Sequence, residues 1–297
     1  MGWRVADHSD YKRDGGQADW DNGVLPVSLK SWDEFNKEIA RLLGLGDFIW
    51  RGQRLDWPLI CQFDRIPRRG NRVNALKDHG NTFLRAIRGR RGSNPPPLAK
   101  EKTDAIWALG QHYGLPTPLL DWTESPFVAA FFAFQDSHCR TLLNAVVEPM
   151  LKMSDDAPPD KWAIENAPCR FVYGLSKDII RWGAGKDKES PPDAYFVELV
   201  DAISESDENP RLLSQRGLFT KSLFPGIPIE DTVRRCYADD VTKGVKRIIL
   251  VKIRIPEIER AKCLRNLNTM NINHATLFPD LMGAAAYCAM KLEIDDY

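Results

Sequence analysis

Residues 127–134 are apolar on every side, and they constrain the fold more than any other part of the sequence. A helix that is apolar all round has no face to offer to water, so it must be buried among other elements. Ser125 and Pro126 directly precede the run, and they suit the N-cap and the first position of a helix. Residues 119–123 are predicted to form a short strand that carries one acid, Asp121, among apolar neighbours. We therefore expect a strand that leads into a buried helix, whose packing holds Asp121 rigidly.

The composition is that of a globular protein with a substantial hydrophobic core. The chain has 297 residues, of which 43% are hydrophobic and 28% are charged, and this excludes disordered, collagen-like and low-complexity classes. The longest apolar run is far shorter than the ~20 residues that cross a bilayer, and the first residues lack the apolar core of a signal peptide. We therefore expect no membrane association and a cytoplasmic location.

Helical and strand patterns are grouped along the chain rather than strictly alternating, which favours an α+β fold over a doubly wound sheet. Residues 1–29 are polar and are interpreted as a loose lead, while residues 30–297 are interpreted as a single domain of mixed short strands and helices. Ser31 and Glu34 are spaced as a capping box at the start of the first helix, which Gly44 ends. Further helices are expected at 75–87, 104–112, after Pro256 and after Pro279, and strands at 47–50, 145–147, 170–173, 195–200 and 247–255.

The candidates for a functional site are polar residues with apolar neighbours or next to a glycine, because their desolvation is costly without a partner or a ligand. Arg51 follows a predicted strand and precedes Gly52. There a guanidinium could hold a phosphate or a carboxylate, or could pair with a buried acid. Asp121 is the sharpest anomaly, since an acid among apolar neighbours is typically paired or functional. It could also cap the helix that begins near Ser125, or pair with Arg51.

Four further residues each have a structural and a functional interpretation. His112 ends a helix, where it could act as a base but more commonly bonds the last carbonyl groups. Trp122 is more often a core residue than a stacking platform. Gln215 precedes a glycine turn, where its amide commonly satisfies the turn. Asp280 follows Pro279 at a helix start, where a carboxylate caps free amides, so it is interpreted as structural.

Charge is distributed unevenly, although the formal net charge is zero. Residues 65–102 contain eleven Lys or Arg against two acids, and such a stretch suits contacts with nucleic-acid phosphates. The arginines assigned to that role are Arg68, Arg69, Arg90 and Arg91. The six cysteines show no Cys-x-x-Cys spacing, so neither a zinc site nor a disulfide framework is expected. No metal is assigned.

Two motifs resemble the FRG domain family, which is named for Phe-Arg-Gly and is found widely in bacteria and their mobile elements. The first comprises residues 50–53 (Trp-Arg-Gly-Gln), in which Trp50 replaces the usual Phe. The second runs from residues 111–114 (Gln-His-Tyr-Gly) through residues 119–123 (Leu-Leu-Asp-Trp-Thr) into the apolar helix. Residues 215–220 and 277–281 resemble later motifs of the family. Pro118 is a departure, because the family usually has Arg at that position.

The resemblance leads by analogy to the ADP-ribosyltransferases, whose site also combines an Arg after an early strand, a polar junction between a strand and a helix, and a later acid or amide. This analogy implies a β-sheet that is split into two parts, and it implies NAD as the substrate. Arg51 would hold the pyrophosphate or a ribose of NAD. Asp121 or Gln215 would orient the ribose hydroxyl or stabilise the charge that develops as nicotinamide leaves. Because Gln215 is not a carboxylate, three further acids stay as candidates: Glu198, Glu205 and Glu208.

The remaining parts of the NAD hypothesis concern the nicotinamide side of the substrate. His112 or Trp122 would contact the nicotinamide or its ribose, and Thr123 would bond the amide or scaffold the site. Gln53 completes the residues assigned to NAD binding, with Arg51, Trp122 and Thr123. A role in bacterial toxicity or phage defence is what the resemblance suggests.

Two alternatives to an enzyme stay open. The chain could be a non-enzymatic module that binds nucleic acid or protein through residues 65–102, although an acid such as Asp121 would then repel phosphates. Alternatively, a buried network between Arg51 and Asp121 could serve only to fix the fold. The first alternative can also be combined with the enzyme, if the basic stretch guides a nucleic-acid substrate to an NAD site.

Overall fold

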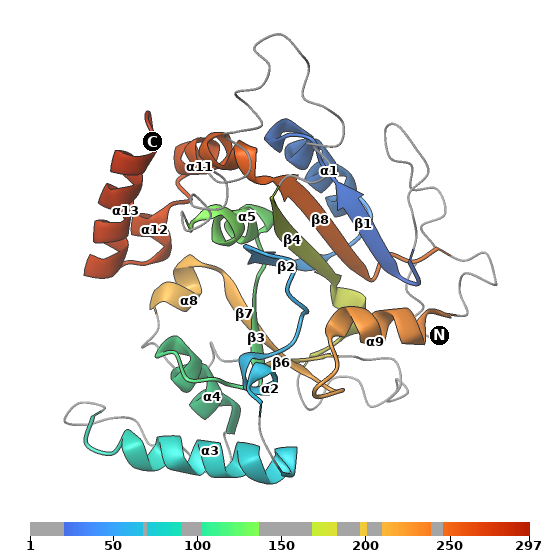
Figure 1. Ribbon diagram of the computed structural model, residues 1–297, viewed down its shortest axis with the longest axis vertical. Helices are drawn as coiled ribbons and strands as arrows, with labels where there is room; N and C mark the ends of the chain where they lie inside the picture. The colour runs from blue at the N-terminus through green and yellow to red at the C-terminus, as the bar shows by residue number, and fades with distance from the viewer. Residues whose placement is uncertain are drawn as a thin grey trace.

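The computed structural model describes residues 21–67, 70–90, 103–136, 168–182, 197–200, 210–238 and 246–297 (Figure 1). The strands are β1 (Val24–Ser28), β2 (Phe48–Gln53), β3 (Leu119–Thr123), β4 (Cys169–Ser176), β5 (Ile180–Trp182), β6 (Val197–Val200), β7 (Gly217–Ser222) and β8 (Leu250–Pro256). The α-helices are α1 (Trp32–Leu43), α2 (Gln62–Arg65), α3 (Arg72–Ala86), α4 (Thr103–His112), α5 (Pro126–Phe134), α8 (Pro210–Ser214), α9 (Ile229–Cys236), α11 (Arg260–Thr269), α12 (His274–Leu277) and α13 (Leu281–Glu293). Within these ranges no helix is long and apolar enough to cross a membrane.

The strands form one mixed sheet in the order β1-β8-β4-β2-β3-β7-β6-β5, so the predicted α+β fold is confirmed. The two halves of the sheet meet at β2 and β3, which are paired through a single residue pair, Trp50 with Thr123. Every other neighbouring pair of described strands is joined over at least three residue pairs. The sheet is therefore two four-stranded halves that separate beyond one point of contact.

Helix α5 is the buried helix that the sequence predicts, and it packs on the half-sheet that contains β2 and β4 (Figure 1). Ala129, Phe131 and Phe134 are 0% exposed. The helix begins as expected, because the Ser125 hydroxyl accepts a hydrogen bond from the Val128 amide at 3.3 Å. Helices α1 and α11 contribute residues to the same core. Strand β3 and helix α5 are thus fixed one after the other at the junction between the two half-sheets.

The cap at the start of α5 predicts a moderate change in the free energy of unfolding. Ser125→Ala removes the side-chain acceptor for a free amide of the first helical turn, and loss of such a cap costs about 1 kcal/mol. Ser125→Asp keeps an acceptor and should stay close to wild type. Urea denaturation of the three proteins measures the difference. Equal stability of Ser125→Ala and wild type would show that the cap contributes nothing here.

Three expectations about the secondary structure need adjustment: the first residues, the cap of the first helix and the helix after Pro256. Strand β1 lies inside the segment interpreted as a loose lead, and it pairs in parallel with β8, which buries Leu25 and Val27. The Ser31 side chain makes no capping bond. The Glu34 carboxylate instead accepts from the Lys30 amide at 2.8 Å. The helix expected after Pro256 begins with a 3-10 turn, Glu257–Glu259, which leads directly into α11, and Pro256 is both the last residue of β8 and the N-cap of this turn.

Other predicted elements agree with the structure or fall outside it. Helices α3 and α4 and strands β4, β6 and β8 occupy the expected places within a few residues. Asp280 caps α13 as predicted, since its carboxylate accepts from the Gly283 amide at 2.9 Å. The strand expected at 145–147 lies outside the described residues.

Candidate functional site

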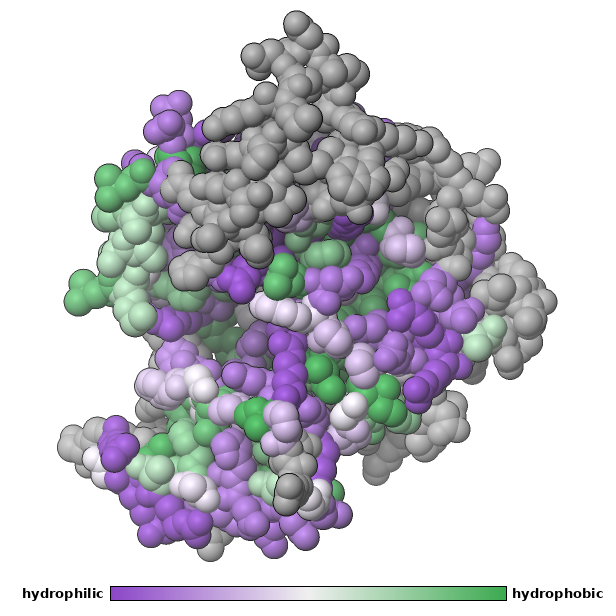
Figure 2. All heavy atoms as spheres, in the orientation of Figure 1, coloured by the Kyte–Doolittle hydropathy of each residue, from purple (hydrophilic) through white to green (hydrophobic). Residues whose placement is uncertain are grey.

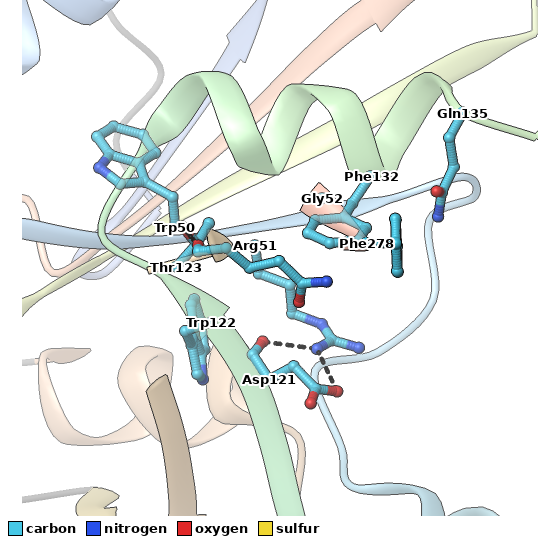
Figure 3. Close-up of a pocket in the computed structure, with 10 residues that line it drawn as sticks. Trp50, Arg51, Gly52, Asp121, Trp122, Thr123, Phe132, Gln135 and Phe278 are labelled. Atoms are coloured by element: carbon cyan, nitrogen blue, oxygen red, sulfur yellow. Dashed lines mark hydrogen bonds and ion pairs between the residues drawn. The ribbon is translucent and has the colours of Figure 1, made fainter. Parts of the chain in front are cut away.

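A cavity of about 320 Å³ opens where β2 and β3 separate (Figure 3), and this volume is within the usual range for small-molecule sites. Five residues singled out in the sequence line it: Arg51, Asp121, Trp122, Thr123 and Gln215. The structure therefore brings together residues from three segments of the family pattern, 50–53, 119–123 and 215–220. Cavity walls formed by α5 and by the segment after α12 add Phe132, Gln135 and Phe278.

Arg51 reaches from β2 toward β3 and carries the main positive charge of the cavity. Its Nη1 atom donates to the Asp121 carbonyl oxygen at 2.7 Å and lies 3.7 Å from the Asp121 carboxylate (Figure 3). Its Nε–H is buried without a hydrogen-bond partner among the described residues. Burial lowers the pKa of Arg51 from its ordinary value, and the nearby Asp121 offsets this only in part. Since a guanidinium stays protonated in proteins, a buried donor with no partner points to an anionic ligand.

Asp121 is held from two sides, although its side chain is 61% exposed. The Gln111 Nε2 donates to Asp121 Oδ1 at 2.6 Å, while Arg51 lies against the other carboxylate oxygen. The Thr117 hydroxyl in turn donates to Gln111 Oε1, which fixes the amide with its NH2 group toward Asp121. Among the described residues that line the cavity, Asp121 is the one acid. The carboxylate is therefore oriented by the protein while it faces solvent.

A second compartment of about 150 Å³ adjoins the first and shares Asp121, Trp122, Gln215 and Phe278 with it. His112 lines this second compartment. Burial and the nearby charge of Arg211 lower the pKa of His112, whereas Asp280 acts in the opposite direction. His112 is consequently neutral at neutral pH and has a ring nitrogen able to accept a proton.

Arg211, on α8, closes one side of the second compartment. Its Nε donates to the Asp280 carboxylate at 2.8 Å, and its guanidinium lies 5.5 Å from the centre of the Phe278 ring. The ring of Phe278 also meets Phe132 edge-on, with the ring centres 6.1 Å apart. These contacts join α5, α8 and the start of α13 around the two compartments.

Three residues assigned to NAD binding donate side-chain hydrogen bonds within the protein. Trp122 is 3% exposed, and its indole N–H donates to the Thr220 hydroxyl at 2.8 Å. Figure 3 shows Trp122 and Asp121 on opposite sides of β3, and both residues line the two compartments. The Thr123 hydroxyl donates to the Gln215 carbonyl oxygen at 2.7 Å. Gln53 is 4% exposed, donates to the Trp57 carbonyl oxygen and is absent from the described cavity wall.

Gln215 lines both compartments, and part of its amide is already engaged. Its Nε2 donates to the Leu277 carbonyl oxygen at 3.1 Å, which ties the turn before β7 to the segment that carries Phe278. The NH2 group of Gln215 therefore bonds a distant segment and does not satisfy the adjacent glycine turn, which the structural interpretation from the sequence expected. Its Oε1 atom has no hydrogen bond among the described residues and is the atom left for a ligand.

The basic stretch is only partly described, since Arg68, Arg69 and Arg91 lie outside the described residues. Arg65 donates to two backbone carbonyl oxygens, of Pro58 and Ile60. Arg72 pairs with Asp64 at 2.7 Å. Part of the positive charge therefore holds the loop before α3 in place, and Arg90 lies exposed just beyond the end of α3.

Sequence reasoning missed the aromatic side of the cavity. Phe132 was included only as part of an apolar helix, and Phe278 only as part of a late motif, so neither was singled out for a ligand. A usable signal existed for Phe278, because it directly precedes Pro279 and Asp280 at a capped helix start. Such positions are fixed in direction by the cap.

Comparison with known proteins gives one match. The FRG domain matches residues 46–141, a range that contains β2, β3, α5 and both motifs on which the resemblance rests. No curated protein matches the chain, and no solved structure matches it. Residues 46–141, which supply Arg51, His112 and Asp121 to the two compartments, belong to the FRG domain family.

Proposed function

We propose that the chain is an enzyme of the ADP-ribosyltransferase type, which binds NAD in the cavity at the junction of the two half-sheets. The observation that carries the proposal is the guanidinium of Arg51, which lines an open cavity and whose Nε–H has no hydrogen-bond partner among the described residues. A guanidinium with a free donor suits the pyrophosphate of a dinucleotide, because planar donors bind phosphate oxygens in pairs. The proposal includes the cytoplasmic location and the role in toxicity or phage defence that the resemblance suggests.

The walls of the cavity fit the other parts of the same substrate. Phe132 and Phe278 provide aromatic surface next to Arg51, and such rings pack against the planar base or the nicotinamide of a dinucleotide. Polar groups at the sides, from Gln135 and Gln215, supply hydrogen-bonding atoms for sugar hydroxyls. Aromatic rings and polar groups therefore share the wall of this cavity, and convergent polar groups fix the orientation of a bound small molecule.

Asp121 takes the role of the catalytic carboxylate in this proposal. When the bond between nicotinamide and ribose breaks, positive charge develops on the ribose, and a fixed carboxylate stabilises that charge. Asp121 is held by Gln111 and Arg51, so little reorganisation is needed as the reaction proceeds. Of the three other acids considered from the sequence, Glu198 lies on β6 and is absent from the described walls of both compartments. Glu205 and Glu208 lie outside the described residues.

The alternative of a non-enzymatic binding module has less support from the described residues. Arg65 and Arg72, at the start of the basic stretch, are engaged in contacts within the protein. A module that only binds phosphates also gives no reason for the carboxylate of Asp121, which Gln111 and Arg51 orient.

Nicotinamide release from NAD by the purified full chain tests the proposal. We expect release by wild type, and a decrease of kcat by about 100-fold in Asp121→Asn, because the variant keeps the hydrogen-bonding shape but loses the charge. Glu124→Gln is the matched control, since Glu124 lies three residues away, pairs with Lys177 and Arg216, and is not a described lining residue. Absence of release by wild type, or full activity of Asp121→Asn, would overturn the proposal.

A further inference from the structure

Helices α3 and α4 pack against each other, and α4 ends beside the second compartment. A Cβ atom added to Gly80 would lie 3.1 Å from the Trp107 ring, and one added to Gly110 would lie 3.3 Å from the Phe83 ring. These two contacts advance along both helices in the same direction, so α3 and α4 run side by side and end on the same side. Figure 1 shows the pair below the sheet. His112 is the last residue of α4 and lines the second compartment, so α3 ends on the same side of the helix pair as the residue that opens into this compartment.

This end of α3 is strongly positive. Arg85, Arg88 and Arg90 are all exposed, and none of them forms an ion pair with a carboxylate in the described part of the chain. Arg85 makes one side-chain contact, to the hydroxyl of Thr82 at 3.3 Å. Figure 2 shows hydrophilic residues over much of this lower part of the molecule. Three guanidinium groups within six residues, none of them paired with a described carboxylate, form a site for successive phosphates.

An exposed aromatic ring lies directly beside His112. Tyr113 follows α4 directly and is 75% exposed. Its ring meets the His112 ring edge-on, with the centres 4.8 Å apart. An exposed ring next to a positive surface is the usual platform for an unpaired base, because stacking binds any base.

We propose that the acceptor of the ADP-ribosyl group is a single-stranded nucleic acid, bound by Arg85, Arg88, Arg90 and Tyr113 and entering the second compartment at His112. This inference rests on the function proposed above. A single strand fits better than a duplex because a base must be unstacked before it lies on Tyr113. The second compartment shares Asp121 with the first, so an acceptor there lies next to the reacting ribose of NAD.

The transfer step assigns a role to His112. The bond between C1′ of the ribose and the nicotinamide nitrogen breaks, and the electron pair leaves with nicotinamide. A hydroxyl or amino group of the strand forms the new bond to C1′, and its proton passes to a ring nitrogen of His112 and then to solvent. Arg211 from α8 and Asp280 from the start of α13 are the charged groups that act on His112. Arg211 favours the neutral imidazole that this step requires.

Binding of a fluorescein-labelled single strand of about 12 nucleotides, as DNA and as RNA, tests the surface. We expect the affinity of the full chain to fall steeply as salt rises. The triple variant Arg85→Ala, Arg88→Ala, Arg90→Ala should bind about tenfold more weakly or worse, and Tyr113→Ala about tenfold more weakly. The matched control replaces three exposed cations elsewhere, Lys37, Arg235 and Lys291, by alanine. Equal affinities of the two triple variants would overturn the assignment of this surface.

Transfer from biotin-labelled NAD to the same oligonucleotide tests the acceptor. We expect wild type to label the strand and Arg51→Ala to give no label. Transfer by His112→Gln should be about 100-fold slower, and the pH–rate profile of this variant should lose its acidic limb. Nicotinamide release without an oligonucleotide is measured in parallel. A parallel reaction contains cell lysate in place of the oligonucleotide. If nicotinamide is released but the label appears on lysate proteins, or on no acceptor, the nucleic-acid acceptor is overturned and the proposed function stands. No release under any condition would overturn both.

Discussion

Arg51→Ala is expected to lower kcat/KM for nicotinamide release by about 1000-fold. The wild-type guanidinium brings a buried charge and an unpartnered Nε–H to the cavity, and the variant removes both the charge and the paired donors. Its ion pair with Asp121 spans 3.7 Å to a side chain that is 61% exposed. Because exposed ion pairs contribute little to stability, the loss of activity should be far larger than any loss of stability.

Two comparisons separate a ligand-binding Arg51 from one that only fixes the fold. Arg51→Lys keeps a positive charge but has no planar fork, so its activity should stay well below wild type. Arg54→Ala is the matched control, because Arg54 lies near the site, pairs with Asp136 at 3.8 Å and is absent from the described cavity wall. Thermal melting is recorded for each variant. If Arg51→Ala unfolds and Arg51→Lys has wild-type activity, Arg51 acts through the fold, as the buried-network hypothesis states.

Local chemistry explains which features could be predicted from the sequence. The all-apolar segment that became α5 and the cap at Asp280 depend on neighbours within a few residues, so their patterns are visible in a single chain. The grouping of Arg51, Asp121 and Gln215 in one cavity was predicted through the family resemblance rather than through spacing. Periodicity alone gives no distance between residues so far apart in the chain.

The features that were missed depend on contacts between distant segments. Strand β1 lies in a polar stretch, and its pairing with β8 is visible only when residues 24–28 and 250–254 are brought together. The Ser31 side chain makes no capping bond, and the Trp32 amide at the start of the same helix donates to Glu259 at 2.9 Å, a residue more than two hundred positions away. Phe278 became part of the cavity because α12 and α13 fold back toward α5 and α8. Tertiary contacts of this kind override local signals.

Gly52→Ala tests whether the site depends on the close packing of α5 on β2. A Cβ atom at position 52 would lie 1.8 Å from the Ala129 carbonyl oxygen and 2.6 Å from the Ala133 amide nitrogen. Both atoms belong to the backbone of a buried helix, so they cannot rotate away as a side chain would. We expect a destabilisation of about 3 kcal/mol or more and a decrease in Tm on the order of 10 °C.

The matched control for this prediction is Gly46→Ala, two residues before β2. The nearest atom to a Cβ there is in the Phe48 ring, at 4.0 Å, which is an ordinary contact, so this variant should melt within a few degrees of wild type. Any Gly52→Ala protein that remains folded must have moved α5 away from β2. Such a movement displaces Phe132 and Gln135 relative to Arg51, so nicotinamide release should fall even below the melting temperature. A Gly52→Ala protein with wild-type Tm and activity would show that α5 does not lie on β2 at this distance.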